Sequence, residues 1–204
     1  VTRAHAQRRP CLEGVDGADS WATDAHKWLN VPYDSGIVIV RDPENLSAAI
    51  TKSAAYLIRS TGEARDNHDF TPESSRRARG FAIWAALRSL GREGLAAMVS
   101  RCCDLATLMS TRLKAGGVVL LNDVVLNQVL VRFEPSGARD ADEFTRAVIR
   151  RIQSGGELWA SGTRRFGRDA LRISISNWST TEADIHRAAD AILAAVRAEE
   201  GAAA

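Results

Sequence analysis

The sequence predicts an α/β protein whose second half is a compact α+β unit, with an antiparallel sheet and helices on one face. From residue 93 onward, helical and strand-like segments follow one another in the order α-β-β-α-β-β-α. In the last strand-like segment, Leu171, Ile173 and Ile175 alternate with polar residues, which is typical of a sheet with one polar face. The helical segments carry apolar residues at a spacing that gathers them on one side.

The first quarter of the chain is predicted from its turn formers and helix signals. Residues 12–35 end in several turn-forming residues. The continuous apolar run Ile37–Arg41 is consistent with a short buried strand. Asp42 then provides an N-cap and Pro43 a first helical residue, so a short helix is expected to follow.

The middle of the chain is predicted to be a loop followed by two helices. Residues 54–72 are loop-like, and Thr71 with Pro72 starts the next helix by the logic of a cap followed by proline. Gly91 ends this helix, and a second one runs from about residue 93 to residue 114.

The remaining segments supply the predicted sheet and its other helices. The predicted strands are 118–121, 128–133, 157–161 and 170–176. The predicted helices are 140–153 and a last helix that starts at Thr180–Glu182.

Composition and charge narrow the classes of protein. The 204 residues are 45% hydrophobic and 25% charged, as in an ordinary globular protein. With 27 Lys and Arg against 25 Asp and Glu, the net charge of +2 gives no field that would attract nucleic acid or a membrane surface. No apolar run is as long as a membrane span, and the first residues do not resemble a signal peptide. We therefore expect a cytoplasmic protein without nucleic-acid or membrane partners.

The cysteines and histidines predict neither a disulfide framework nor a metal site. The cysteines are three in number, and the adjacent pair Cys102 and Cys103 lies on a helical pattern that points poorly for bridging. Together with the four histidines, they lack the spacing of zinc ligands.

One lysine has an unusual neighbourhood: Lys27 directly follows His26 and lies between Trp21 and Trp28. Lysine is rarely buried, because its ammonium is costly to desolvate. Apolar surroundings lower the pKa of a lysine and turn its amine into a nucleophile suited to Schiff-base chemistry. On spacing alone, the commoner alternative is a surface lysine whose stem lies along Trp28.

Further motifs follow this segment in a fixed order. The lysine segment comprises Ala18–Ser20, His26–Leu29 and Pro32–Gly36, and later motifs are Ser75–Arg79, Leu90–Gly94, Leu126–Val129 and Gly162–Ser174. In these motifs the chain resembles the group II pyridoxal-phosphate-dependent amino-acid decarboxylases, the relatives of aromatic-amino-acid and glutamate decarboxylases. The resemblance covers roughly residues 12–197.

The resemblance implies a fold-type-I, PLP-dependent transferase-like fold. It assigns residues 12–55 to the end of the large cofactor-binding domain, 56–91 to a loop and connecting helix, and 92–204 to the small α+β C-terminal domain. Residues 1–11 match no motif and are unassigned, with disorder as one expectation. Because the cofactor lysine comes late in the family, the chain is expected to be a C-terminal portion of a homodimeric enzyme.

The resemblance also implies roles for residues near the cofactor, pyridoxal 5'-phosphate. Lys27 would form the Schiff base and later donate or accept a proton, and His26 would contact the cofactor phosphate with a ring N–H. Asp24 stands at a phosphate-side position, although a carboxylate cannot donate to phosphate and could instead cap a turn. Ser75 matches a position from which a partner-subunit hydroxyl reaches the phosphate, with a first-turn helix residue as the equal alternative.

Two further features concern the substrate and the outcome of the reaction. Arg172 lies where fold-type-I enzymes commonly hold a substrate carboxylate, with a structural role as the alternative. The loop of about Ser60–Phe70 lacks the proton-donating tyrosine of aromatic-amino-acid decarboxylases, and only His68 there could replace it. This departure leaves oxidative or transaminating outcomes open.

Together these features imply a PLP-dependent carboxy-lyase that removes the α-carboxylate of an L-amino acid through a Schiff base and a quinonoid. The alternatives are an aminotransferase on the same fold and a truncated, non-catalytic remnant. In relatives, the aspartate that pairs with the pyridine nitrogen, the ring-stacking aromatic and most of the phosphate cradle lie upstream of the lysine. Since this chain lacks that region, we expect it to be inactive alone.

Overall fold

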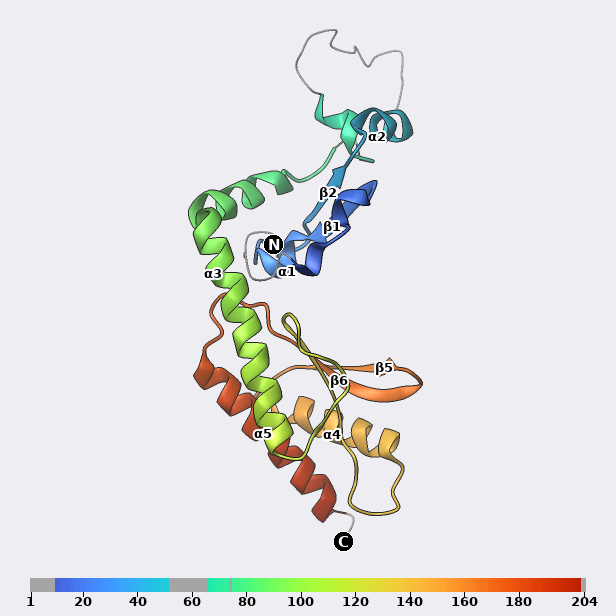
Figure 1. The fold of residues 1–204 in the computed structure, drawn as a ribbon, viewed down its shortest axis with the longest axis vertical. Coiled ribbons are helices and arrows are strands. Elements are labelled where there is room, and N and C mark those ends of the chain that lie inside the picture. Colours follow the sequence, from blue (N-terminus) through green and yellow to red (C-terminus); the bar gives the residue numbers. More distant parts are fainter. Residues whose placement is uncertain (1–9, 52–65, 74, 203–204) are drawn as a thin grey trace. The chain divides into compact units, whose positions relative to one another are not determined.

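The computed structural model describes residues 10–51, 66–73 and 75–202. These residues form two units, one ending at Arg92 and the other beginning at Glu93 (Figure 1). The predictions for residues 1–9 and for residues 54–65 of the loop lie outside the described residues.

The first unit is built on a two-stranded antiparallel ribbon. Its strands are β1 (Ser20–Asp24) and β2 (Gly36–Val40), and Asp24 lies opposite Gly36 at the end where they are connected. A 3-10 turn, η3 (Val15–Gly17), precedes β1, and a four-residue helix, α1 (Ala25–Trp28), follows β1 directly. The short elements β1 and α1 were not anticipated from the sequence.

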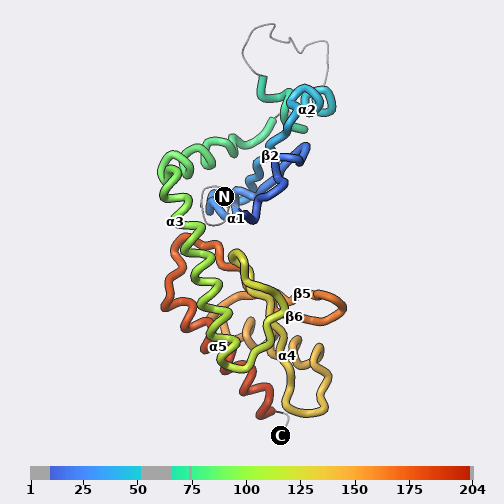
Figure 2. The backbone as a smooth tube through the Cα atoms, viewed as in Figure 1, coloured from blue at the N-terminus to red at the C-terminus, as the bar shows by residue number. Residues whose placement is uncertain are grey.

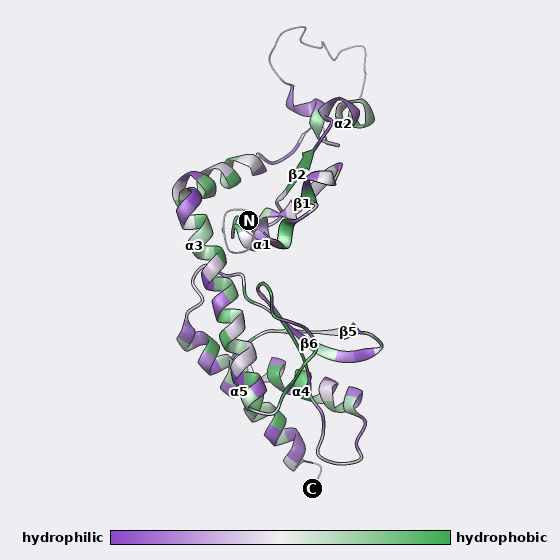
Figure 3. Ribbon diagram, in the orientation of Figure 1, coloured by the Kyte–Doolittle hydropathy of each residue, from purple (hydrophilic) through white to green (hydrophobic). Residues whose placement is uncertain are grey.

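The apolar strand β2 is not buried within the described residues. Val38 is 54% exposed and Ile39 is 60% exposed, although hydropathy colouring marks β2 as apolar (Figure 3). The prediction of a buried strand is therefore wrong for this structure. The physical reason is that β2 pairs only with β1 in a two-stranded sheet, which leaves side chains on both faces accessible.

Two predicted helix signals after the ribbon have different outcomes. The N-cap at Asp42 is confirmed, since its carboxylate accepts from the amides of Glu44 and Asn45 at 3.0 and 3.2 Å and α2 (Pro43–Ile50) follows. The helix start at Thr71 is wrong. Instead, the Thr71 hydroxyl donates to the Glu73 carbonyl at 3.2 Å, and a 3-10 turn, η4 (Asn67–Phe70), precedes it.

The long helix α3 (Arg79–Ala115) joins the two units and is interrupted once. At Gly91 the backbone has φ of 61° and ψ of −172°, which are non-helical values. A φ in this range favours glycine because it has no Cβ. The prediction that Gly91 separates two helical segments is confirmed.

The second unit is a four-stranded antiparallel sheet with the strand order β3-β4-β6-β5. The strands are β3 (Val119–Leu120), β4 (Gln128–Arg132), β5 (Ser161–Arg165) and β6 (Arg168–Ser174). The helix α4 (Ala141–Gly155) lies between β4 and β5, and α5 (Glu182–Gly201) follows β6. The predicted order of elements is confirmed, and β5 with β6 forms a hairpin (Figure 2). One strand is displaced: β5 begins at Ser161, where the strand predicted for 157–161 was expected to end.

One core joins the sheet of this unit to α3, α4 and α5. Val129, Val131 and Leu171 of the sheet are fully buried, as are Phe144 of α4 and Ile192 of α5. Arg172 and Ser174 of β6 alternate with these residues and are exposed. The prediction of helices on one face and polar residues on the other is confirmed.

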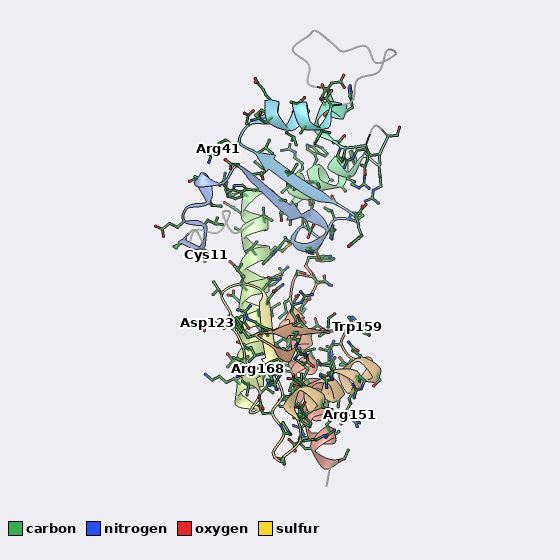
Figure 4. All side chains as sticks on the ribbon, turned by 90° about the vertical axis from the view of Figure 1, so that its right-hand side faces the viewer. Cys11, Arg41, Asp123, Arg151, Trp159 and Arg168 are labelled. Carbon is green, nitrogen blue, oxygen red and sulfur yellow. The ribbon has the colours of Figure 1, made fainter. Side chains whose placement is uncertain are left out.

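Within the described residues, the structure contains no helix with the length and apolar character needed to cross a membrane. The same residues hold no cluster of three or more potential metal ligands. Cys11, labelled in Figure 4, is an exposed free thiol. Cys102 and Cys103 are buried free thiols, and burial raises the pKa of Cys102, which makes it a poor nucleophile.

Candidate functional site

The lysine segment is fixed at its two ends and presents Lys27 to solvent. Ala25 at the start of α1 and Leu29 just after it are buried. The carbonyl oxygen of Ser35 accepts from the Ala25 amide at 2.9 Å, which closes the loop between α1 and β2. The Lys27 side chain is 64% exposed. The described residues therefore give Lys27 no apolar enclosure, and its amine is open to a ligand.

Asp24 lies at the N-cap of α1 and makes an ion pair with Lys27. Its Oδ2 accepts a hydrogen bond from Lys27 Nζ, and its side chain accepts none from the amides of the first turn of α1. The hydrogen bond from Lys27 lowers the pKa of the Asp24 carboxyl below its ordinary value. The suggestion that Asp24 caps the turn is wrong, because its carboxylate is engaged by Lys27.

His26 points one ring nitrogen at the backbone of Ser35. The Ser35 N–H donates to His26 Nδ1 at 3.0 Å, and the Ser35 carbonyl oxygen lies 2.8 Å from the same nitrogen. The ring of Tyr33 lies against the ring of His26, with a centroid distance of 4.1 Å. The ring of His26 is thus held at Nδ1, and Nε2 is the nitrogen left for a ligand.

Asp34, between Tyr33 and Ser35, is bound by two arginines: Arg77 just before α3 and Arg79 at its first residue. Its carbonyl oxygen accepts from Arg77 Nη2 at 2.9 Å and from Arg79 Nε at 3.0 Å. Its carboxylate accepts from Arg79 Nε at 3.0 Å and from Arg79 Nη2 at 3.3 Å. We call Asp34, Arg77 and Arg79 the Asp34 clasp.

The Asp34 clasp was missed from the sequence. In the sequence, Arg77 and Arg79 were noted only as members of the motif Ser75–Arg79, and Asp34 only as a member of Pro32–Gly36. The hydrogen bonds with Arg79 lower the pKa of the Asp34 carboxyl and raise that of the guanidinium. The partners are 43 and 45 residues apart, and no local sequence pattern reports a contact of that range.

Ser75 and His68 belong to the same unit as Lys27. Ser75 is exposed in the segment before α3, so the suggestion that it lies in a first helical turn is wrong. His68 lies in η4, with Nδ1 at 3.0 Å from Asp66 and Nε2 at 3.3 Å from Asp69. The phosphate role of Ser75 and the proton-donor role of His68 stay predictions.

Arg172 belongs to the second unit. It is exposed on the polar face of β6, opposite Leu130 of β4 and Ser161 of β5. It lines a groove of about 360 Å³ together with Arg164 and Arg165. This cationic groove can bind an anion such as a carboxylate, although the role of Arg172 toward a substrate stays a prediction.

A comparison with known protein families shows which family the chain belongs to. The model described as the pyridoxal-dependent decarboxylase conserved domain matches residues 3–134, more than half of the chain. The chain belongs to this family. The resemblance stated from the motifs around Lys27 is thereby confirmed, and the family's cofactor is pyridoxal phosphate.

Several curated proteins are similar to this member of the decarboxylase family. An aromatic-L-amino-acid decarboxylase of Bacillus atrophaeus is 28% identical over 84% of the chain and 37% of its own length. Tryptophan decarboxylase 1 of Oryza sativa is 26% identical over 81% of the chain and 34% of its own length. A phenylacetaldehyde synthase of Arabidopsis thaliana is 25% identical over 88% of the chain and 38% of its own length. The chain therefore spans somewhat over a third of the length of these relatives.

Solved structures confirm the fold-type-I decarboxylase fold. The Oryza sativa TDC crystallised with PLP and tryptamine superposes with a TM-score of 0.86 at 23% identity, covering 95% of this chain and 42% of the solved one. Mouse CSAD in the apo form gives a TM-score of 0.82 at 18% identity, and the match covers 95% of this chain and 43% of the solved one.

The chemistry of the lysine segment fits pyridoxal phosphate in part. Lys27 offers an exposed amine to an aldehyde, and His26 Nε2 can donate to a phosphate. Ser35 Oγ is buried and has no hydrogen-bond partner among the described residues, which leaves a polar group of this segment unsatisfied. Asp24 does not fit a phosphate contact, because both groups are anionic.

We expect the substitution Asp24→Asn to speed the covalent labelling of Lys27 by pyridoxal phosphate. The pair with Asp24 must be broken before Lys27 Nζ can attack an aldehyde. Exposed ion pairs are weak, so the expected gain in rate is about 1.4- to five-fold. The rate is measured by borohydride quenching at successive times. A slower reaction of the variant would show that the carboxylate assists Lys27 instead of restraining it.

Proposed function

We propose that this chain contributes the cofactor-lysine segment and the small domain of a PLP-dependent carboxy-lyase that acts on an L-amino acid. Within this function, Lys27 is the catalytic residue that attaches the cofactor. His26 faces the cofactor phosphate, Asp24 controls the availability of the Lys27 amine, and Arg172 binds a substrate carboxylate.

The observation that carries this proposal is the juxtaposition of His26 and Lys27 on α1, in a chain of the decarboxylase family. Lys27 Nζ is exposed and hydrogen-bonded to a carboxylate, so it can hold or release a proton at that atom. The adjacent His26 Nε2 can bind an anion. When bound, the cofactor supplies the electron sink for loss of a carboxylate.

The proposal extends to the organisation of the protein. We assign residues 12–55 to the end of a large cofactor-binding domain, 56–91 to a loop and connecting helix, and 92–204 to a small domain. We further propose that the protein acts as a homodimer in which Ser75 reaches the phosphate of the partner subunit's site. The exposed position of Ser75 supports this assignment.

The test is reductive labelling of the chain. After incubation with pyridoxal phosphate and reduction with borohydride, digestion and mass spectrometry locate the modified lysine. We expect stoichiometric labelling at Lys27, with Lys52 and Lys114 spared. Weak labelling spread over the three lysines would contradict a selective site in this chain and would favour the non-catalytic remnant.

A second candidate is an oxidative or transaminating reaction at the same site. Two observations favour it: residues 60–70 contain no tyrosine, and one relative is named phenylacetaldehyde synthase. The two candidates differ in product, since decarboxylation gives an amine with carbon dioxide and transamination gives a ketoacid without it. An aldehyde with carbon dioxide would identify the oxidative outcome.

A further inference from the structure

We infer that Asp34, clamped by Arg77 and Arg79, is a positioning residue for His26 and acts through the peptide group that it shares with Ser35. The inference rests on the proposed function, because it concerns how His26 faces a phosphate. All of the contacts that carry it lie within the unit that ends at Arg92.

Ser35 presents a donor and an acceptor to the same nitrogen of His26. The N–H of Ser35 supports the neutral ring that carries its proton on Nε2. A proton on Nδ1, in either the neutral or the charged ring, would leave the N–H of the buried Ser35 without this acceptor, whereas the Ser35 carbonyl already accepts from the Ala25 amide. The contacts therefore favour the ring with its proton on Nε2, where it can be donated to an anion.

The Asp34 clasp fixes the peptide group that performs this task. The carbonyl of Asp34 and the N–H of Ser35 belong to one planar peptide unit. Arg77 and Arg79 donate to that carbonyl at 2.9 and 3.0 Å, on the opposite side of the unit from the N–H that binds His26. A rotation of this peptide away from His26 would therefore break two charge-assisted hydrogen bonds as well.

The carboxylate of Asp34 keeps the arginines in place. Arg79 binds it through Nε and Nη2 and is only 22% exposed, so it is held by packing as well as by charge. The ring of Tyr33 adds a second constraint by lying against the ring of His26. The direction of His26 Nε2 thus depends on Arg77 and Arg79, which act through the peptide group of Asp34 and Ser35.

The test compares the rates at which pyridoxal phosphate and pyridoxal, which lacks the phosphate, label Lys27 of the full chain. We expect the double variant Arg77→Met, Arg79→Met to lose about three- to ten-fold of the preference for the phosphate form, the scale of one ordinary hydrogen bond. Labelling by pyridoxal should be unchanged. His26→Gln should reduce the preference for the phosphate form by a similar factor. Adding His26→Gln to the double variant should reduce that preference little further. Arg76→Met, a matched control whose partner is Glu73, should keep the preference.

A second readout does not depend on the cofactor. Nitrogen NMR of the histidine-labelled chain, assigned with His26→Gln, should show the His26 ring in the Nε2–H form in the wild type. The double variant should shift these signals toward an average of both neutral forms, and Arg76→Met should not. Unchanged His26 signals in the double variant, or an equal loss of labelling by both aldehydes, would overturn the inference. If wild-type Lys27 is not labelled selectively, the proposed function fails, and the nitrogen spectrum alone decides on the Asp34 clasp.

Discussion

Replacement of Lys27 by arginine is expected to abolish covalent attachment of pyridoxal phosphate to the chain. Arginine keeps the positive charge that pairs with Asp24, but its guanidinium stays protonated and does not condense with an aldehyde. After borohydride reduction, labelling should fall from one cofactor per chain to background.

A matched substitution at Lys114 controls for this result. Lys114 is exposed on α3 in the second unit, and Lys114→Arg makes the same chemical change away from the lysine segment. It should leave the labelling at Lys27 unchanged. If Lys27→Arg still attaches the cofactor stoichiometrically, the role proposed for Lys27 is wrong.

Replacement of Phe144 by alanine is expected to lower the free energy of unfolding of the second unit by about 3–5 kcal/mol. The Phe144 side chain is 0% exposed and packs in the core between the sheet and the helices. Its loss removes buried apolar surface and leaves a cavity. The measurement is urea unfolding at 25 °C followed by circular dichroism.

The control for this prediction is the same substitution at Phe166, in the turn between β5 and β6. Phe166 is 84% exposed and lies beneath the guanidinium of Arg165, at 4.4 Å from the ring centroid. Phe166→Ala should change stability by no more than about 1 kcal/mol. Equal losses at Phe144 and Phe166 would contradict the core described for this unit.

Most of the second unit could be predicted because its signals are local and agree with one another. The alternation of Leu171, Ile173 and Ile175 reports the two faces of β6, and each member of the set is buried as expected. At the last helix, Thr181 and Asp184 form a reciprocal capping box at the predicted start. Each of these patterns is contained in a few consecutive residues.

The lysine segment could be predicted only in part, since its geometry depends on contacts that no local pattern contains. The segment around Lys27 was found through its resemblance to a family, whereas the strand before it has no clear alternation. Thr71 and Pro72 imitate a helix start, yet α3 begins at Arg79, whose guanidinium binds Asp34. Helix signals describe what a segment can form, and they do not report that residues 75–78 stay non-helical before α3.

The two-stranded ribbon has a consequence for the state of the protein in solution. Within the described residues, β1 and β2 pair only with each other, so each strand has one outer edge without a strand partner. An open edge with exposed apolar residues such as Val38 and Ile39 is a template on which another extended chain can add by backbone hydrogen bonding. The same strand that positions the lysine segment is therefore a site of intermolecular strand addition unless a further strand covers its edge.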